Sequence, residues 1–202
     1  MRMGLIVRVA FVGALFAAIG CTSTVVTSLP PTVRRVVVFP PYRLGGAETR
    51  STATESELFG LPSRTIEDLL AQQARAQLTA KGFDVVETSI VKQSTKDRVP
   101  TSPQMAAQIL QDAKLDAAAL YIEVRRWEPM PSERGLKADG VIVALDVMIV
   151  DPKTGAILWQ VNRPSRPVPL YSVVLTGQAN VFVAETVMKE VFTQLGSRQP
   201  GG

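Results

Sequence analysis

In the first half of the chain, patterns typical of strands alternate with patterns typical of helices. Residues 35–39 (RVVVF) form a continuous apolar run that two prolines close, as expected of a buried strand. Thr65 and Asp68 then resemble a capping box that begins a helix, and Gly82 is expected to end it in a left-handed conformation. Residues 83–87 (FDVVE) are a second predicted strand. Helical spacing predicts one buried face of the helix: Ile66, Leu69, Leu70, Ala74 and Leu78.

Two polar stretches flank this helix and strand. Residues 42–61 lack clear periodicity and contain two adjacent glycines, so we expect a long loop, which in a compact domain is often functional. Residues 88–101 are also predicted to be a loop. Ser102 then suits an N-cap and Pro103 the first position of a second helix.

The second half is predicted to form three antiparallel strands and a closing helix. The first strand covers 117–127 and the second 141–150, where the odd-numbered residues from Val141 to Ile149 are apolar. A turn at Asp151-Pro152-Lys153-Thr154-Gly155 leads into a short return strand at 157–159. On the first strand, alternation places Leu120, Ile122 and Val124 on one face and Tyr121, Glu123, Arg125 and Trp127 on the other.

Three prolines (Pro164, Pro167 and Pro169) predict an irregular stretch after the return strand. The last helix is predicted over residues 178–195. The order of elements predicts an α/β (α+β) fold: a mixed β-sheet built from strand, helix, strand and helix, then a three-strand antiparallel meander and a C-terminal helix.

The N-terminus has the pattern of a secretory leader. Arg2 and Arg8 supply positive charge, and residues 9–19 are uninterrupted apolar and small residues, a stretch too short for a comfortable membrane span. The residues before Cys21, Ala17-Ala18-Ile19-Gly20, resemble the bacterial lipobox. That resemblance implies cleavage by signal peptidase II between Gly20 and Cys21 and a lipid anchor on Cys21, where an ordinary buried cysteine is the alternative.

These features divide the chain into four expected parts. Residues 1–20 are a lipoprotein signal peptide, 21–33 a lipidated tether rich in Ser, Thr and Pro, 34–196 a single α/β domain, and 197–202 a disordered tail. Thr22 stands where an aspartate commonly retains a lipoprotein in the inner membrane. We therefore expect the outer membrane, with the domain facing the periplasm.

Composition narrows the chemistry. The chain has no histidine and one cysteine, which removes Ser-His and Cys-His nucleophile pairs, the commonest metal ligand and any intramolecular disulfide. The net charge of +4 falls to +2 without the two leader arginines, and no basic cluster with interleaved aromatics suggests nucleic-acid binding. No catalytic residue, metal site or cofactor is predicted.

Two groups of polar residues remain as candidates. Glu123, Arg125 and Asp146 can meet across neighbouring strands, either as a carboxylate pair for acid–base chemistry or as a cross-strand ion pair, which we favour. Arg125, Arg126 and Trp127 form a possible partner surface, with ordinary strand chemistry as the preferred alternative.

Two stretches of the chain resemble a known group of proteins: the block from Leu115 to Ile122 and the D-x-x-T-G-x-x-L-W pattern from Asp151 to Trp159. On these stretches the chain is similar to periplasmic lipoproteins related to the curli-secretion lipoprotein and the penicillin-binding-protein activator lipoproteins, whose fold resembles the TolB N-terminal domain. The match extends in element order from about Arg35 to Leu195. It implies that fold and a role in envelope assembly, and it brings no catalytic residues.

The sequence thus favours a palmitoylated lipoprotein that is not an enzyme. We expect it to bind a periplasmic or membrane protein, or a further copy of itself, during envelope assembly, secretion or transport. The expected contacts include residues 42–61 and 128–139. One alternative is an auxiliary lipid-binding lipoprotein of an ABC-type lipid transport system, which would need a dry apolar groove. Another is an enzyme that uses Asp146 or Glu123.

Overall fold

The computed structural model describes residues 29–45, 65–130, 140–170 and 176–197, so Cys21 and the leader lie outside the described residues. The elements, in chain order, are β1 (Arg35–Val38), β2 (Tyr42–Arg43), α1 (Ile66–Ala80), β3 (Asp84–Val85), α2 (Thr88–Thr95), α3 (Pro103–Asp112), β4 (Ala118–Met130), β5 (Gly140–Val150), β6 (Ile157–Pro169) and α4 (Thr176–Thr193).

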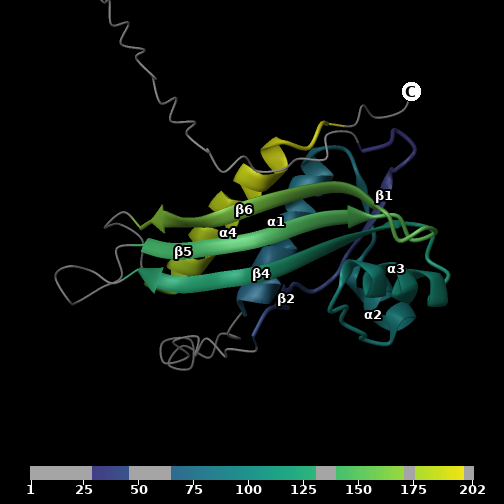
Figure 1. Cartoon of the computed structure of the whole chain (residues 1–202), viewed down its shortest axis with the longest axis horizontal. Coiled ribbons are helices and arrows are strands. Elements are labelled where there is room, and N and C mark those ends of the chain that lie inside the picture. Colours follow the sequence, from purple (N-terminus) through teal and green to yellow (C-terminus); the bar gives the residue numbers. More distant parts are fainter. Residues whose placement is uncertain (1–28, 46–64, 131–139, 171–175, 198–202) are drawn as a thin grey trace, which may run out of the picture.

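These elements confirm the predicted fold class. The strands form one mixed sheet in the order β3-β1-β4-β5-β6, and β2 pairs separately with β4. Strand β1 is parallel to both β3 and β4, whereas β4, β5 and β6 form the antiparallel meander. Figure 1 shows α1 and α4 crossing one side of the meander and α2 with α3 gathered near one end of it.

The sheet separates two hydrophobic clusters. The larger contains the apolar faces of α1 and α4 and the sheet residues that point toward them, and we call this side of the sheet the covered face. Trp159 stacks on Phe192 there, with ring centroids 5.8 Å apart. The smaller cluster joins α2 and α3 to the opposite side, which we call the open face, through Phe39, Tyr121 and Met148 among others.

The first helix follows its sequence pattern closely. Thr65 and Asp68 form the capping box, and the five residues predicted to face inward are all buried. Gly82 has a φ of +83°, so the left-handed residue after the helix is also confirmed.

Three local predictions are corrected. Residues 88–95, predicted as loop, form α2, whose Val91 and Thr95 are buried against its neighbours although the helix has little apolar surface. Strand β6 continues through all three prolines to Pro169, because it lies at the edge of the sheet in the described structure, where a missing N–H is tolerated. Tyr42 and Arg43, expected in a loop, form β2, while residues 46–61 lie outside the described residues.

The face predicted for Trp127 is wrong. The register between β4 and β5 shifts between Val124 and Arg126, so that Arg125 is an extra residue in its strand. Such a bulge reverses the alternation that follows it. Trp127 therefore joins Leu120, Ile122 and Val124 in the cluster of the covered face.

Candidate functional site

The open face of the meander carries a polar group that the described helices leave uncovered. Helices α2 and α3 cover this face only near the beginning of β4 (Figure 1). Further along the strands, the ladder brings Glu123 of β4, Asp146 of β5 and Asn162 of β6 side by side. We treat this group as the candidate site and call it the polar strip; it also includes Arg125, Arg126, Glu128 and Ser165.

Asp146 is the centre of the polar strip. Asp146 is 9% exposed, and its Oδ2 lies 3.0 Å from Nε of Arg125. The other oxygen, Oδ1, is buried without a hydrogen-bond partner. Burial raises the pKa of Asp146, and the charge of Arg125 and the Asn162 side chain oppose that rise.

The cross-strand ion pair preferred from the sequence is thereby confirmed as the contact of Arg125 with Asp146. Glu123 is the ladder partner of Asp146, so the two carboxylates do lie on neighbouring strands of one face. Arg125 also donates from Nη2 to the carbonyl oxygen of Arg163 at 3.3 Å, which connects β4 across β5 to β6. This bridging holds Arg125 in place beside Asp146.

Tyr121 lies on the same face, at the boundary between the polar strip and the smaller apolar cluster. Its ring is fully buried. Burial, and after it the nearby carboxylate of Glu123, raise the pKa of its hydroxyl. The phenol therefore stays protonated at neutral pH.

The outer part of the polar strip is exposed. Arg126 forms an ion pair with Glu128, with Nη2 and Oε2 2.7 Å apart, and donates from Nη1 to Oγ of Ser165 at 3.3 Å. These three side chains present a positive charge, a negative charge and a hydroxyl group to solvent.

The expected patch of Arg125, Arg126 and Trp127 is divided between the two faces. Arg125 and Arg126 are exposed, but Trp127 is 6% exposed and donates from Nε1 to Oδ1 of Asn180 on α4 at 3.4 Å. The bulge, which has no simple sequence signal, accounts for the difference.

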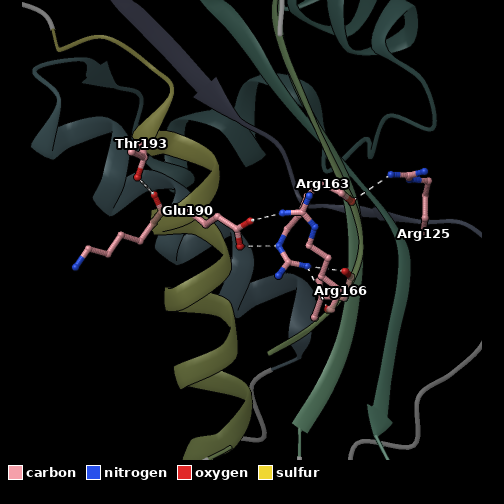
Figure 2. Close-up of polar contacts among 7 residues, drawn as sticks. Arg125, Arg163, Arg166, Glu190 and Thr193 are labelled. Carbon is pink, nitrogen blue, oxygen red and sulfur yellow. Dashed lines mark hydrogen bonds and ion pairs between the residues drawn. The ribbon is translucent and has the colours of Figure 1, made fainter. Parts of the chain in front are cut away.

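A second polar cluster, on the covered face, was not found from the sequence. Figure 2 shows Arg163 of β6 pointing at Glu190 of α4, with Nε and Oε2 2.9 Å apart. The Arg163 side chain is 5% exposed and also donates from Nη1 to the carbonyl oxygen of Val143 at 2.6 Å. The two residues are far apart in sequence, and a buried arginine in a proline-rich segment gives no periodic signal. The contacts point to helix docking, not chemistry.

A recess of about 580 Å³ lies at the end of the sheet where the chain arrives from residues 30–35. Its lining includes Arg34, Arg35, Asp116, Asp151 and Lys153 as well as apolar residues. These charges do not match the dry apolar groove that the lipid-transport alternative requires.

The described residues contain no group of three or more His, Cys, Asp or Glu that could hold a metal ion. Ser89 and Lys92 stand at the S-x-x-K spacing of some acyl-transfer enzymes, a pair that the sequence reasoning overlooked. Both are exposed on α2, and Ser89 donates to Glu87 at 3.4 Å.

Within the described parts of the chain, no helix has both the length and the apolar character needed to cross a membrane.

No protein-family model matches the sequence, and a search of curated proteins finds no match. Several solved structures are similar to the chain. A PelC dodecamer from Paraburkholderia phytofirmans is 16% identical over 88% of this chain and 100% of that chain, with a TM-score of 0.45. The lipoprotein GNA1162 from Neisseria meningitidis is 17% identical over 80% and 99%, with a TM-score of 0.42.

The C-terminal domain of LpoB from Salmonella enterica is 13% identical over 68% of this chain and 83% of that chain, with a TM-score of 0.40. Bacterial lipoproteins are therefore among the structures that this chain resembles. With identities and TM-scores this low, the similarity does not assign the chain to a family.

Proposed function

We propose that this chain is a bacterial lipoprotein, anchored through Cys21, which binds a protein partner in the periplasm as a non-enzymatic accessory of envelope assembly, secretion or transport. One observation carries the proposal. The only cysteine of the chain directly follows a leader-like segment and the lipobox-like sequence Ala17-Ala18-Ile19-Gly20. Lipid on Cys21 would supply the stable anchor that the leader, once cleaved, does not.

The described fold is compatible with a domain held close to its anchor. Leu29 is the first described residue and β1 begins at Arg35, so few residues separate Cys21 from the sheet. We place the folded domain at residues 34–196. Thr22, in place of aspartate, favours the outer membrane.

The polar strip is the surface that we assign to the partner. It is an extended face of the meander, and its outer side chains, Arg126, Glu128 and Ser165, are exposed but already tied to one another. Side chains fixed in this way lose little conformational entropy when a second protein covers them. Charges of both signs favour a partner with a complementary pattern over a small apolar ligand.

The anchor is tested by Cys21→Ala. The wild-type chain is expected to incorporate labelled palmitate and to fractionate with the outer membrane. The variant is expected to lose the label and to leave the membrane fraction. A variant that still sediments with membranes and still carries palmitate would contradict the anchor.

The partner surface is tested with a photo-crosslinking amino acid at Ser165 in cells. The matched control carries it at Glu185, which is exposed on α4, away from the open face. We expect one defined protein adduct, identified by mass spectrometry, from position 165 and none from position 185. Equal yields at both positions, or no adduct at either, would rule the polar strip out as a partner surface.

A further inference from the structure

We propose that one end of the domain lies against the membrane and contacts anionic lipid headgroups through exposed cations. This end, which we call the tether end, comprises residues 30–35, the turn at 81–83, residues 114–116 and the turn at 151–156. The inference rests on the proposed lipid anchor at Cys21, and it adds an orientation and a lipid contact that the anchor alone does not imply.

Sheet topology places these four segments together. Strands β1, β3 and β4 are mutually parallel and begin at this end, whereas antiparallel β5 ends here and turns into β6. Contacts join these segments directly and through their neighbours: Nζ of Lys153 lies 4.0 Å from Oδ1 of Asp116, and Asp84, which directly follows the turn at 81–83, donates its backbone N–H to the carbonyl oxygen of Arg34 at 2.9 Å. The side chain of Gln111, near the end of α3, also donates to the carbonyl oxygens of Pro152 and Lys153. The recess described above is lined in part by residues of three of these segments, 30–35, 114–116 and 151–156.

The length of the tether limits the orientation of the domain. Eight residues lead from Cys21 to Leu29, and a fully extended chain of that length spans at most about 28 Å. Strand β4 has 13 residues and is about 43 Å long. The opposite end of the sheet therefore cannot rest on the membrane with the tether end raised above it.

Charge favours contact at the tether end. Five cations gather there, against three carboxylates if Asp84 at the start of β3 is included. Asp84 pairs with Arg35, Asp116 lies 4.0 Å from Lys153, and Asp151 accepts hydrogen bonds from its own turn. Among the described residues, Arg34, Lys81 and Lys114 form no ion pair. The cations are Arg34, Arg35, Lys114 and Lys153, which are exposed, and Lys81, which is half-buried.

Exposed cations beside a negatively charged leaflet are attracted over about one Debye length, roughly 8–10 Å at ordinary salt. A tether of at most about 28 Å allows the tether end to come within that distance of the leaflet. A second attachment of this kind would hold the domain upright, so that β4, β5 and β6 extend away from the membrane and present the polar strip to the periplasm.

The chain offers a direct test because its one native cysteine is the proposed lipid site. Ala156→Cys places a fluorescent probe in the exposed turn of the tether end, and Ser165→Cys places one nine residues further along the same hairpin, about 30 Å away. The lipidated proteins are reconstituted into phosphatidylcholine vesicles, with and without phosphatidylglycerol, that contain a lipid with a nitroxide on its headgroup. We expect several-fold stronger quenching at position 156 than at 165, and a larger difference with phosphatidylglycerol.

The charge contribution is tested by adding Arg34→Glu and Lys114→Glu to the Ala156→Cys protein. This double change is expected to reduce quenching on anionic vesicles to the level seen on neutral ones. Lys189→Glu on α4, also exposed but outside the tether end, is the matched control and is expected to leave quenching unchanged.

Equal quenching at positions 156 and 165, or none at either in protein that floats with the vesicles, would overturn the orientation. Quenching that is strong at 156 but indifferent to phosphatidylglycerol and to the double change would overturn the lipid contact. Failure of the anchor itself would be recognised separately, because protein without palmitate would not float with vesicles of phosphatidylcholine alone.

Discussion

Nε of Arg163 on β6 lies 2.9 Å from Oε2 of Glu190 on α4, and this contact fixes the C-terminal helix to the edge strand (Figure 2). The guanidinium is almost fully buried, whereas the carboxylate is 42% exposed. Loss of the Glu190 carboxylate would leave the buried guanidinium of Arg163 with backbone carbonyl oxygens as its only acceptors among the described residues.

Glu190→Ala is therefore expected to lower the free energy of unfolding by about 1–2 kcal/mol, a value reduced for the exposure of the carboxylate. Glu185→Ala, on the same helix and exposed, is the control and should change stability by no more than about 0.5 kcal/mol. Denaturant unfolding of the two variants measures the difference. Equal effects would mean that the contact does not stabilise the docked helix.

Adjacent residues of β4 should respond very differently to truncation. Trp127→Ala removes a buried indole that packs toward α4, and we expect a loss of about 3–5 kcal/mol. Arg126→Ala removes an exposed ion pair and should cost no more than about 1 kcal/mol. Thermal unfolding distinguishes them, and a small loss for Trp127→Ala would contradict the reversed alternation after the bulge.

Gly140 begins β5 in close contact with its neighbouring strand. A Cβ atom there would lie 2.7 Å from the carbonyl oxygen of Val168, so backbone would have to move. Gly140→Ala is expected to destabilise the domain by about 1–3 kcal/mol. Gly196→Ala, where no atom lies within 4 Å of the added group, should leave the unfolding midpoint nearly unchanged.

The buried carboxylate of the polar strip predicts a pH dependence. Burial raises the pKa of Asp146 in the folded state, so the folded chain binds the proton more tightly than the unfolded chain does. This group should therefore reduce stability as pH rises from the ordinary aspartate value of 3.8 through the raised value. Asp146→Asn cannot ionise, so its stability relative to wild type should improve as pH rises.

Unfolding free energies of both proteins between acidic and neutral pH measure that difference. A relative stability of Asp146→Asn that declines as pH rises would show that the attraction to Arg125 outweighs the cost of burial. A stability difference between the two proteins that does not change with pH would mean that folding does not shift the pKa of Asp146.

The parts of the fold that the sequence predicted are those where one face of an element packs against the core. The odd-numbered apolar residues of 141–149 and the inward residues of α1 repeat at a fixed period, so their faces follow directly. The turn from Asp151 to Gly155 was equally predictable. Asp151 and Thr154 hydrogen-bond within the turn, and Gly155 takes a φ of +70°.

The errors arose where tertiary structure overrides the local pattern. The bulge at Arg125 depends on the register with β5, which alternation within β4 does not reveal. The prolines of β6 are tolerated because of the position of the strand at the sheet edge, which requires knowledge of strand order. In the candidate site, the pairing of Arg125 with Asp146 was predictable from strand adjacency, but the contact of Arg163 with Glu190 required the placement of α4.

The position of β1 has a consequence for the order in which the chain acquires its structure. Although it comes first, β1 lies inside the sheet, where Val36 pairs with Val85 on one side and with Ala118 on the other. Closing such long loops is slower than forming the local hairpins of the meander. If the N-terminus leaves the export machinery first, β1 must wait for more than eighty further residues before its second neighbour arrives. Until then its row of valines is exposed. A chaperone that shields this segment would therefore have to stay bound until the chain has been exported at least as far as β4.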